Sequence, residues 1–201
     1  DLASPKLLAV TLARRGALVT TVDQLESEIE VWRRLADRET GLRFLVGDGR
    51  ALPFADASFD HATSISVLEH VAGEGGDVAA LAELARCIRP GGRVVITLPF
   101  APEAWVEHRH APAYVDHGER DDQGRAFFQR WYDEAGVTRL VGGVAALELV
   151  ESSVARMRPN LNAAYTRTFP LLVPLGPVFG ALARERRGPG GDVVRILLRR
   201  R

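Results

Sequence analysis

The chain of 201 residues is 46% hydrophobic and 26% charged, which suits a single soluble globular domain with a full core. Its 26 basic and 26 acidic side chains balance, whereas nucleic-acid-binding domains usually carry a basic excess, so we expect no nucleic-acid partner. A single cysteine, Cys87, excludes an internal disulfide framework. With no signal-peptide pattern and no apolar run of about 18 residues, we expect a cytoplasmic protein without an integral membrane segment.

The first half of the chain alternates predicted helices with predicted strands. Apolar residues at helical spacing predict helices over 6–16, 25–38 and 76–89. Runs rich in β-branched residues predict strands over 17–23, 42–48, 58–67 and 93–99. Asp77 is expected to cap the third helix, which directs Leu81, Leu84 and Ile88 inward. This alternation predicts right-handed crossovers and a mainly parallel sheet with helices on both faces.

The regular alternation stops after Pro99. Residues 100–124 show no clear period and are expected to form a long excursion, followed by a helix over 127–141. Strands are predicted over 147–157 and 192–200. We therefore expect one domain over 1–201, and its parts are a core over 1–100, a lid over 101–132 and C-terminal strands over 133–201 with an inserted segment at 158–190.

Acidic residues stand at the predicted ends of three strands: Asp1, Asp23 and Asp48. In open parallel sheets, ligands bind outside the carboxyl ends of the strands. A carboxylate at such an end can accept hydrogen bonds from both hydroxyls of a ribose, or from an exocyclic amine. The alternative is that a strand-end Asp only caps the next helix. Asp23 and Asp48, with neither a basic cluster nor a Gly-rich loop between them, favour an uncharged nucleoside over a pyrophosphate.

The stretch "GDGRALPFADASFDHATSISVLEHV" and the later "IRPGGRVVITLP" are the most specific motifs in the chain. They closely resemble the class I S-adenosylmethionine-dependent methyltransferases, in particular the small-molecule enzymes with the pattern D-x-x-x-L-P-F-x-x-x-S-F-D. The resemblance covers about residues 1–100. It implies a doubly wound Rossmann-like α/β sheet of about seven strands, mainly parallel with an antiparallel last strand, and a first strand that is truncated here.

The resemblance also implies roles for individual residues. Asp23 would bind the ribose hydroxyls with Gln24 beside it, and Asp48 would meet the adenine amine with Gly49 and Arg50 flanking the ring. The methionine portion would be lined by Ser64 and Ile65. Near the acceptor, His70 is the first candidate for a general base and Glu69 the second. The alternative for His70 is a structural hydrogen bond at the start of a helix.

The opening loop departs from the family pattern acid-x-Gly-x-Gly-x-Gly. Asp1 would end the first strand, and Ala3, Pro5 and Leu7 occupy the glycine positions. Ser4 is expected to cap a helix that has Pro5 at its first position. Lys6 either meets the carboxylate of the cofactor or points into solvent. We expect the residues Asp1, Ala3, Ser4 and Lys6 to contribute to cofactor binding.

The function implied is methyl transfer from S-adenosylmethionine to a small-molecule or lipid/glycan acceptor. The alternative is a catalytically inactive binding or regulatory module with the same fold. A dinucleotide-dependent oxidoreductase is disfavoured because no G-x-G-x-x-G is present. The acids and histidines near His108, His110 and His117 match no metal-ligand spacing, so no metal site is expected. A homo-oligomer is possible. The aromatic residues of the later segment line an acceptor pocket or anchor the lid: Trp105, Tyr114, Phe127, Phe128, Trp131 and Tyr132.

Overall fold

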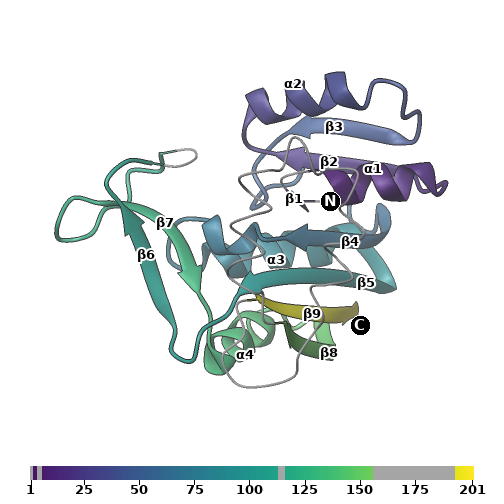
Figure 1. Cartoon of the computed structure of the whole chain (residues 1–201). Coiled ribbons are helices and arrows are strands. Elements are labelled where there is room, and N and C mark those ends of the chain that lie inside the picture. Colours follow the sequence, from purple (N-terminus) through teal and green to yellow (C-terminus); the bar gives the residue numbers. More distant parts are fainter. Residues whose placement is uncertain (1, 4–5, 113–115, 156–192) are drawn as a thin grey trace.

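The computed structural model describes residues 2–3, 6–112, 116–155 and 193–201, and it shows a mixed α/β fold around a mostly parallel sheet (Figure 1). Five strands follow the order β1-β4-β5-β9-β8. They are β1 (Leu2–Ala3), β4 (Phe59–Ile65), β5 (Ile88–Pro99), β9 (Val193–Arg200) and β8 (Leu147–Ala155). The ladders β1–β4 and β4–β5 are parallel, and β9 is antiparallel to both of its neighbours. The predicted antiparallel last strand is therefore confirmed.

Two further parallel strands, β2 (Val19–Asp23) and β3 (Leu42–Val46), pair with each other. β1 contacts both β2 and β4, so this pair lies next to the five-stranded sheet. β2 and β3 are parallel to each other, and residues at or just after the carboxyl ends of β2, β3 and β4 line one common pocket, so these ends lie at one edge. That edge is where a ligand site is expected.

The helices are α1 (Leu7–Arg14), α2 (Glu26–Leu35), α3 (Gly76–Cys87) and α4 (Glu134–Gly142), with a short 3₁₀ helix η1 (Leu68–His70). Figure 1 shows α1 and α2 beside β2 and β3. α3 contacts β5, and α4 contacts β8. The main core lies where α3 packs on the sheet, and Leu81, Leu84 and Ile88 all face it as predicted. In β9, buried Val194, Ile196 and Leu198 alternate with the more exposed Arg195, Leu197 and Arg199, which is the period-two pattern of a strand with one buried face.

The later half differs from the prediction at one element. β6 (Trp105–Arg109) and β7 (Ala126–Trp131) pair as an antiparallel hairpin, so a helix starting at residue 127 is wrong. The run "AFFQRW" is aromatic-rich and pairs with "WVEHR", a tertiary contact that overrides helical spacing. The helix instead begins at Glu134, because the Asp133 carboxylate accepts a hydrogen bond from the Gly136 amide at 2.7 Å. Figure 1 shows the hairpin projecting from the side of the sheet.

The two ends of this hairpin segment are joined to each other. The Tyr132 amide donates to the Pro99 carbonyl at 3.0 Å, and the Ala101 amide donates to the Tyr132 carbonyl at 2.8 Å. The chain therefore leaves the sheet after β5 and returns beside the same point before α4.

The starts of two helices also differ from the prediction. α1 begins at Leu7 with Lys6 at its N-cap, two residues later than a helix started by Ser4 and Pro5. α3 begins after Gly75, whose φ of +68° suits glycine, so Asp77 is not its cap. Asp77 is buried inside the first turn and accepts hydrogen bonds from Tyr132 Oη (2.9 Å) and Arg139 Nη2 (3.1 Å).

The first strand extends beyond the predicted boundary at Asp1, since Leu2 and Ala3 pair with Ser64 and Ile65 of β4. Asp1, Ser4 and the predicted insertion at 158–190 lie outside the described residues. Within the part of the chain that the structure describes, no helix combines the length and apolar character needed to span a bilayer.

Candidate functional site

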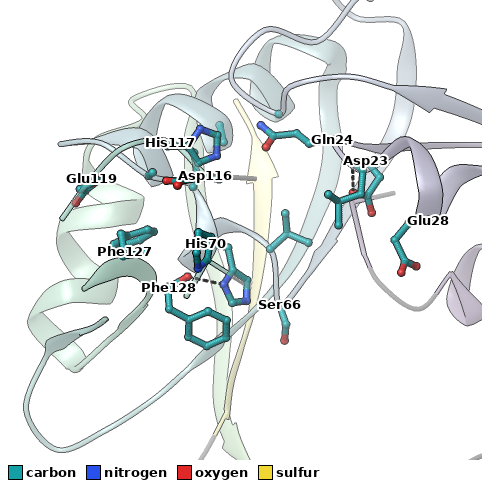
Figure 2. Close-up of a pocket in the computed structure, with 18 of the residues that line it drawn as sticks. Asp23, Gln24, Glu28, Ser66, His70, Asp116, His117, Glu119, Phe127 and Phe128 are labelled. Carbon is teal, nitrogen blue, oxygen red and sulfur yellow. Dashed lines mark hydrogen bonds between the residues drawn. The ribbon is translucent and has the colours of Figure 1, made fainter. Parts of the chain in front are cut away.

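A pocket opens at the carboxyl edge of β2, β3 and β4, where the strand-end acids are predicted to lie (Figure 2). Its floor comes from the ends of these strands and the residues that follow them, and its outer wall comes from the hairpin segment. The residues on the sheet side include Asp23, Gln24, Glu28, Gly49, Ser66 and His70. Those on the hairpin side include Asp116, His117, Glu119, Arg120, Phe127 and Phe128.

Asp23, the last residue of β2, is held by two hydrogen bonds. Its Oδ1 accepts from the Leu25 amide at 3.0 Å, and its Oδ2 accepts from Lys6 Nζ at 2.7 Å. Lys6 is 0% exposed, so the alternative in which Lys6 points into solvent is wrong. Leu25 takes the N-cap position of α2, so capping that helix is not the role of Asp23. The carboxylate is thus fixed at the pocket with a buried cation beside it.

Asp48 follows β3 and forms a bidentate ion pair with Arg50. The Arg50 side chain donates to both carboxylate oxygens at 2.7–3.1 Å, and the Arg50 amide donates to Oδ1 at 2.8 Å. The hydrogen bond from the Arg50 side chain is the main cause that holds the pKa of Asp48 below its usual range. Among the described pocket residues, Gly49 lines the cavity, whereas Asp48 and Arg50 lie beside it.

Ser64 and Ile65 lie at the end of β4, but they are not among the described residues that line the pocket. Ser64 is fully buried, and its Oγ has no hydrogen-bond partner within the described part of the chain. Ser66, which follows them, does line the pocket and adopts a φ of +54°. Its amide donates to Thr97 Oγ1 at 3.0 Å. The predicted residues Ser64 and Ile65 therefore lie directly before Ser66, which is the residue of the "TSIS" motif that lines the described pocket.

His70 ends η1 and lies on the pocket wall (Figure 2). Its Nδ1 is 2.8 Å from the Phe128 carbonyl of β7, and its ring meets the Phe128 ring edge-on at a centroid distance of 5.0 Å. Burial lowers the pKa of His70, against the opposing effect of the Phe128 hydrogen bond. The imidazole is therefore predominantly neutral at neutral pH, and a neutral imidazole can accept a proton.

Glu69, the other predicted catalytic residue, lies next to His70 and is not among the described residues that line the pocket. Its side chain is 2% exposed, its Oε1 is 3.9 Å from His70 Nε2, and its Oε2 has no hydrogen-bond partner among the described residues. Burial raises the pKa of Glu69 to about 8. This carboxyl is consequently protonated at neutral pH, so it is an acid and not a base.

Hydrogen bonds connect the hairpin side of the pocket to residues 71–73, which follow η1. Arg130 donates to the Val71 carbonyl at 2.5 Å and to the Gly73 carbonyl at 2.6 Å. The Gly73 amide donates to Glu119 Oε2 at 2.8 Å. These bonds hold the hairpin against residues 71–73, so the two sides of the pocket are connected.

Among the predicted aromatic residues, Tyr114 lies outside the described part of the chain, and the others divide between the two alternatives. Phe127 and Phe128 line the pocket. Trp105 and Trp131 stack on each other at 5.6 Å and brace the hairpin, while Tyr132 is buried in the core. Glu28 lines the pocket but was not predicted, because its spacing marks it only as a polar position of α2.

No group of three histidine, cysteine or acidic side chains that could hold a metal ion lies within residues 2–3, 6–112, 116–155 and 193–201. The ion pairs Arg120–Asp116 and Arg125–Asp121 occupy several of the acids that the sequence places there. Asp116 and Asp121 of this segment are thus paired with arginines.

Comparison with known proteins finds similarity between this chain and methyltransferases. Residues 4–96 match the model of the methyltransferase domain. The chain is 45% identical over 116 residues to a demethylmenaquinone methyltransferase of Beutenbergia cavernae, covering 52% of this chain and 47% of that protein. A demethylmenaquinone methyltransferase of Corynebacterium kroppenstedtii is 36% identical over 143 residues, covering 65% of this chain and 58% of that protein. The chain thus spans about half the length of these curated relatives.

A solved structure shares the fold. The 1,6-didemethyltoxoflavin-N1-methyltransferase of Burkholderia thailandensis, with bound 1,6-didemethyltoxoflavin and S-adenosylhomocysteine, has a TM-score of 0.64 at 19% identity. The match covers 98% of this chain and 68% of that one.

Proposed function

We propose that the chain, whose residues 4–96 match the methyltransferase-domain model, is a class I S-adenosylmethionine-dependent methyltransferase that transfers a methyl group from S-adenosylmethionine to a small-molecule acceptor. The observation that carries the proposal is the pocket itself, which joins the acid at the end of β2 to a neutral histidine and an aromatic wall. An inactive binding module would need the acid to hold the cofactor, but it would have no use for a neutral histidine beside the aromatic wall.

The residues on the sheet side fit the cofactor. The Asp23 oxygens each accept one hydrogen bond in the protein, and a carboxylate has about four acceptor positions, so it can also accept from a ribose diol. Gln24 lies beside it on the wall. Asp48 and Arg50 are fixed as a pair next to Gly49, where the carboxylate can receive the adenine amine. Ser64 and Ile65 would support the turn at Ser66 that faces the methionine portion.

The opening segment contributes through Lys6. We infer that its buried ammonium, held by Asp23, also meets the cofactor carboxylate with a charge-assisted hydrogen bond. Asp1, Ala3 and Ser4 stay predicted contributors. When bound, S-adenosylmethionine supplies a methyl group already activated by a sulfonium. What the protein adds is alignment of the acceptor and removal of its proton.

His70 is proposed as the base. Its Nε2 would take the proton from an acceptor hydroxyl or acidic C–H, so that this bond breaks as the N–H bond forms. Glu69 would act only through His70, because its buried carboxyl does not face the pocket among the described residues. The lid role stays proposed for 101–132, and its hairpin supplies Phe127 and Phe128 against the acceptor.

The relatives that act on demethylmenaquinone suggest a hydroxylated aromatic ring as the acceptor, and the phenylalanine wall supports this. A cytoplasmic location, no nucleic-acid partner and a seven-stranded sheet are part of the same proposal. The contacts of β1 with β2 and β4 support the single sheet.

Isothermal titration with S-adenosylmethionine, S-adenosylhomocysteine and NAD tests the cofactor assignment. We expect micromolar binding of the first two and none of NAD; the reverse preference rules the proposal out. Transfer of labelled methyl from S-adenosylmethionine to reduced demethylmenaquinone, with a His70→Ala control, tests the acceptor class. Cofactor binding without transfer to this or other phenols and amines supports the inactive module instead.

A further inference from the structure

One residue of the β6–β7 hairpin has no counterpart on the opposite strand. Gln129 lies opposite Glu107, and Phe127 lies opposite His108, the next residue of β6. Phe128 is therefore the extra residue of a β-bulge. A bulge interrupts the ladder and re-aims a side chain, which explains why two consecutive residues, Phe127 and Phe128, both line the pocket.

The bulge also takes the Phe128 carbonyl out of the ladder and turns it toward His70, whose Nδ1 lies 2.8 Å away. A carbonyl oxygen can only accept, so Nδ1 must carry the proton of this hydrogen bond. In a neutral imidazole, the lone pair is then on Nε2. The hydrogen bond and the edge-on ring contact together determine both the orientation of the imidazole and its tautomer.

We propose that the Phe128 bulge is a positioning element for the reaction: its carbonyl selects the Nδ1-protonated tautomer of His70 and thereby makes Nε2 the basic atom. The tautomer assignment concerns the free protein. Only the consequence for proton removal rests on the proposed function.

The charged groups around His70 are consistent with a neutral ring. Arg109 of β6 holds its guanidinium carbon 3.2 Å from the centroid of the Phe128 ring, and it is itself held by Glu107 at 2.9 Å. Arg109 lowers the pKa of His70 and Glu107 raises it, both less than burial does. Glu69, on the same 3₁₀ helix, is a neutral acid. The charged or titratable groups on the hairpin side of the pocket are Asp116, His117, Glu119 and Arg120.

The test is to delete Phe128. The deletion brings Phe127 and Gln129 together opposite His108 and Glu107, so the ladder can continue without a bulge. The matched control is Phe128→Leu, which removes the ring but keeps the extra residue and its carbonyl. Long-range ¹H–¹⁵N NMR of the free protein, labelled at histidine, reports which ring nitrogen of His70 is protonated.

We expect the Nδ1-protonated form in the wild type and in Phe128→Leu, and loss of this preference in the deletion variant. A wild type protonated on Nε2, or a deletion variant that keeps the Nδ1 form, overturns the proposal. If the deletion variant does not fold, the wild-type and Phe128→Leu spectra still decide the tautomer.

Measurements of kcat test whether Nε2 of His70 is the base, independently of the tautomer that NMR reports. The deletion should lower kcat by about 100-fold or more, the size of a lost general base, with unchanged affinity for S-adenosylhomocysteine. If the wild type transfers no methyl group at all, the proposed function fails while the NMR result stands. If the deletion variant changes tautomer but keeps its kcat, Nε2 is not the base.

Discussion

Lys6 Nζ lies 2.7 Å from Asp23 Oδ2, which links the residue before α1 to the last residue of β2. The lysine is 0% exposed and the aspartate side chain 17% exposed, so the ion pair is largely withdrawn from water. Removing one partner of such a pair costs more than removing both, because it leaves a buried charge uncompensated. A comparison of single and double variants of Lys6 and Asp23 therefore separates the contribution of the pair to stability from the contribution of Asp23 to binding.

Asp23→Ala should weaken S-adenosylmethionine binding by at least about tenfold, since it removes the acceptor for the ribose hydroxyls. It should also lower the free energy of unfolding by about 3 kcal/mol, because Lys6 is left buried without this partner. Titration calorimetry and urea denaturation measure the two effects.

The control for Asp23→Ala is the double variant Lys6→Met, Asp23→Ala. It should recover most of the lost stability but none of the affinity, because both charges are gone and the ribose acceptor is still missing. Recovery of affinity in the double variant would show that Asp23 does not bind the cofactor directly.

The adenine amine should be recognised by Asp48. The wild type is expected to bind S-adenosylhomocysteine about tenfold more tightly than S-inosylhomocysteine, which lacks the amine, and Asp48→Ala should lose this preference. Arg50→Gln is the matched control, because it keeps the carboxylate and should keep the preference. Equal discrimination in the wild type and in Asp48→Ala contradicts the assignment.

Glu69 should make the protein less stable as the pH rises. Its pKa is 4.5 ordinarily and about 8 in the fold, so between these values the folded state holds one proton more than the unfolded state. The contribution that favours folding is complete below pH 4.5 and falls by about 1.4 kcal/mol for each pH unit up to about pH 8. Thermal unfolding from pH 5 to 8 measures the slope.

Glu69→Gln should remove this slope, because the amide is neutral at every pH and has nearly the same shape as the protonated acid. The variant should therefore be more stable than the wild type at pH 8. A wild type and a variant that respond to pH in the same way would show that Glu69 is ionised in the fold.

Tyr132→Phe should lower the free energy of unfolding by about 1–2 kcal/mol, because it removes the hydroxyl that donates to the buried Asp77 carboxylate. Cofactor affinity should not change, since neither residue is on the described pocket wall. Arg139→Gln removes a second donor to the Asp77 carboxylate, but from a side chain that is 54% exposed, and should cost less. Chemical denaturation of the three proteins ranks these effects.

Much of the sheet could be predicted because strands and helices there have clear periods. The segments around β2, β3, β4, β5, β8 and β9 all appear where the β-branched runs predict them. The strand-end rule also placed Asp23 at the pocket, because the carboxyl ends of parallel strands necessarily share one edge.

What could not be predicted depends on contacts between distant segments. The run at 127–131 fits a helix by local spacing and becomes a strand only because it pairs with β6. The burial of Lys6 depends on a carboxylate 17 residues away. The orientation of His70 depends on a carbonyl 58 residues away, exposed by a bulge that has no sequence signature of its own.

The joined ends of the hairpin segment have a consequence for how this protein can diversify. Pro99 and Ala101 are both hydrogen-bonded to Tyr132, so the segment that runs from Ala101 to Tyr132 leaves and rejoins the rest of the fold at one point. A replacement of any length that preserves those two hydrogen bonds would leave β5 and α4 in register with the core. The half of the pocket that we propose for the acceptor could thus be replaced as one segment, while the half that we propose for the nucleoside is left unchanged.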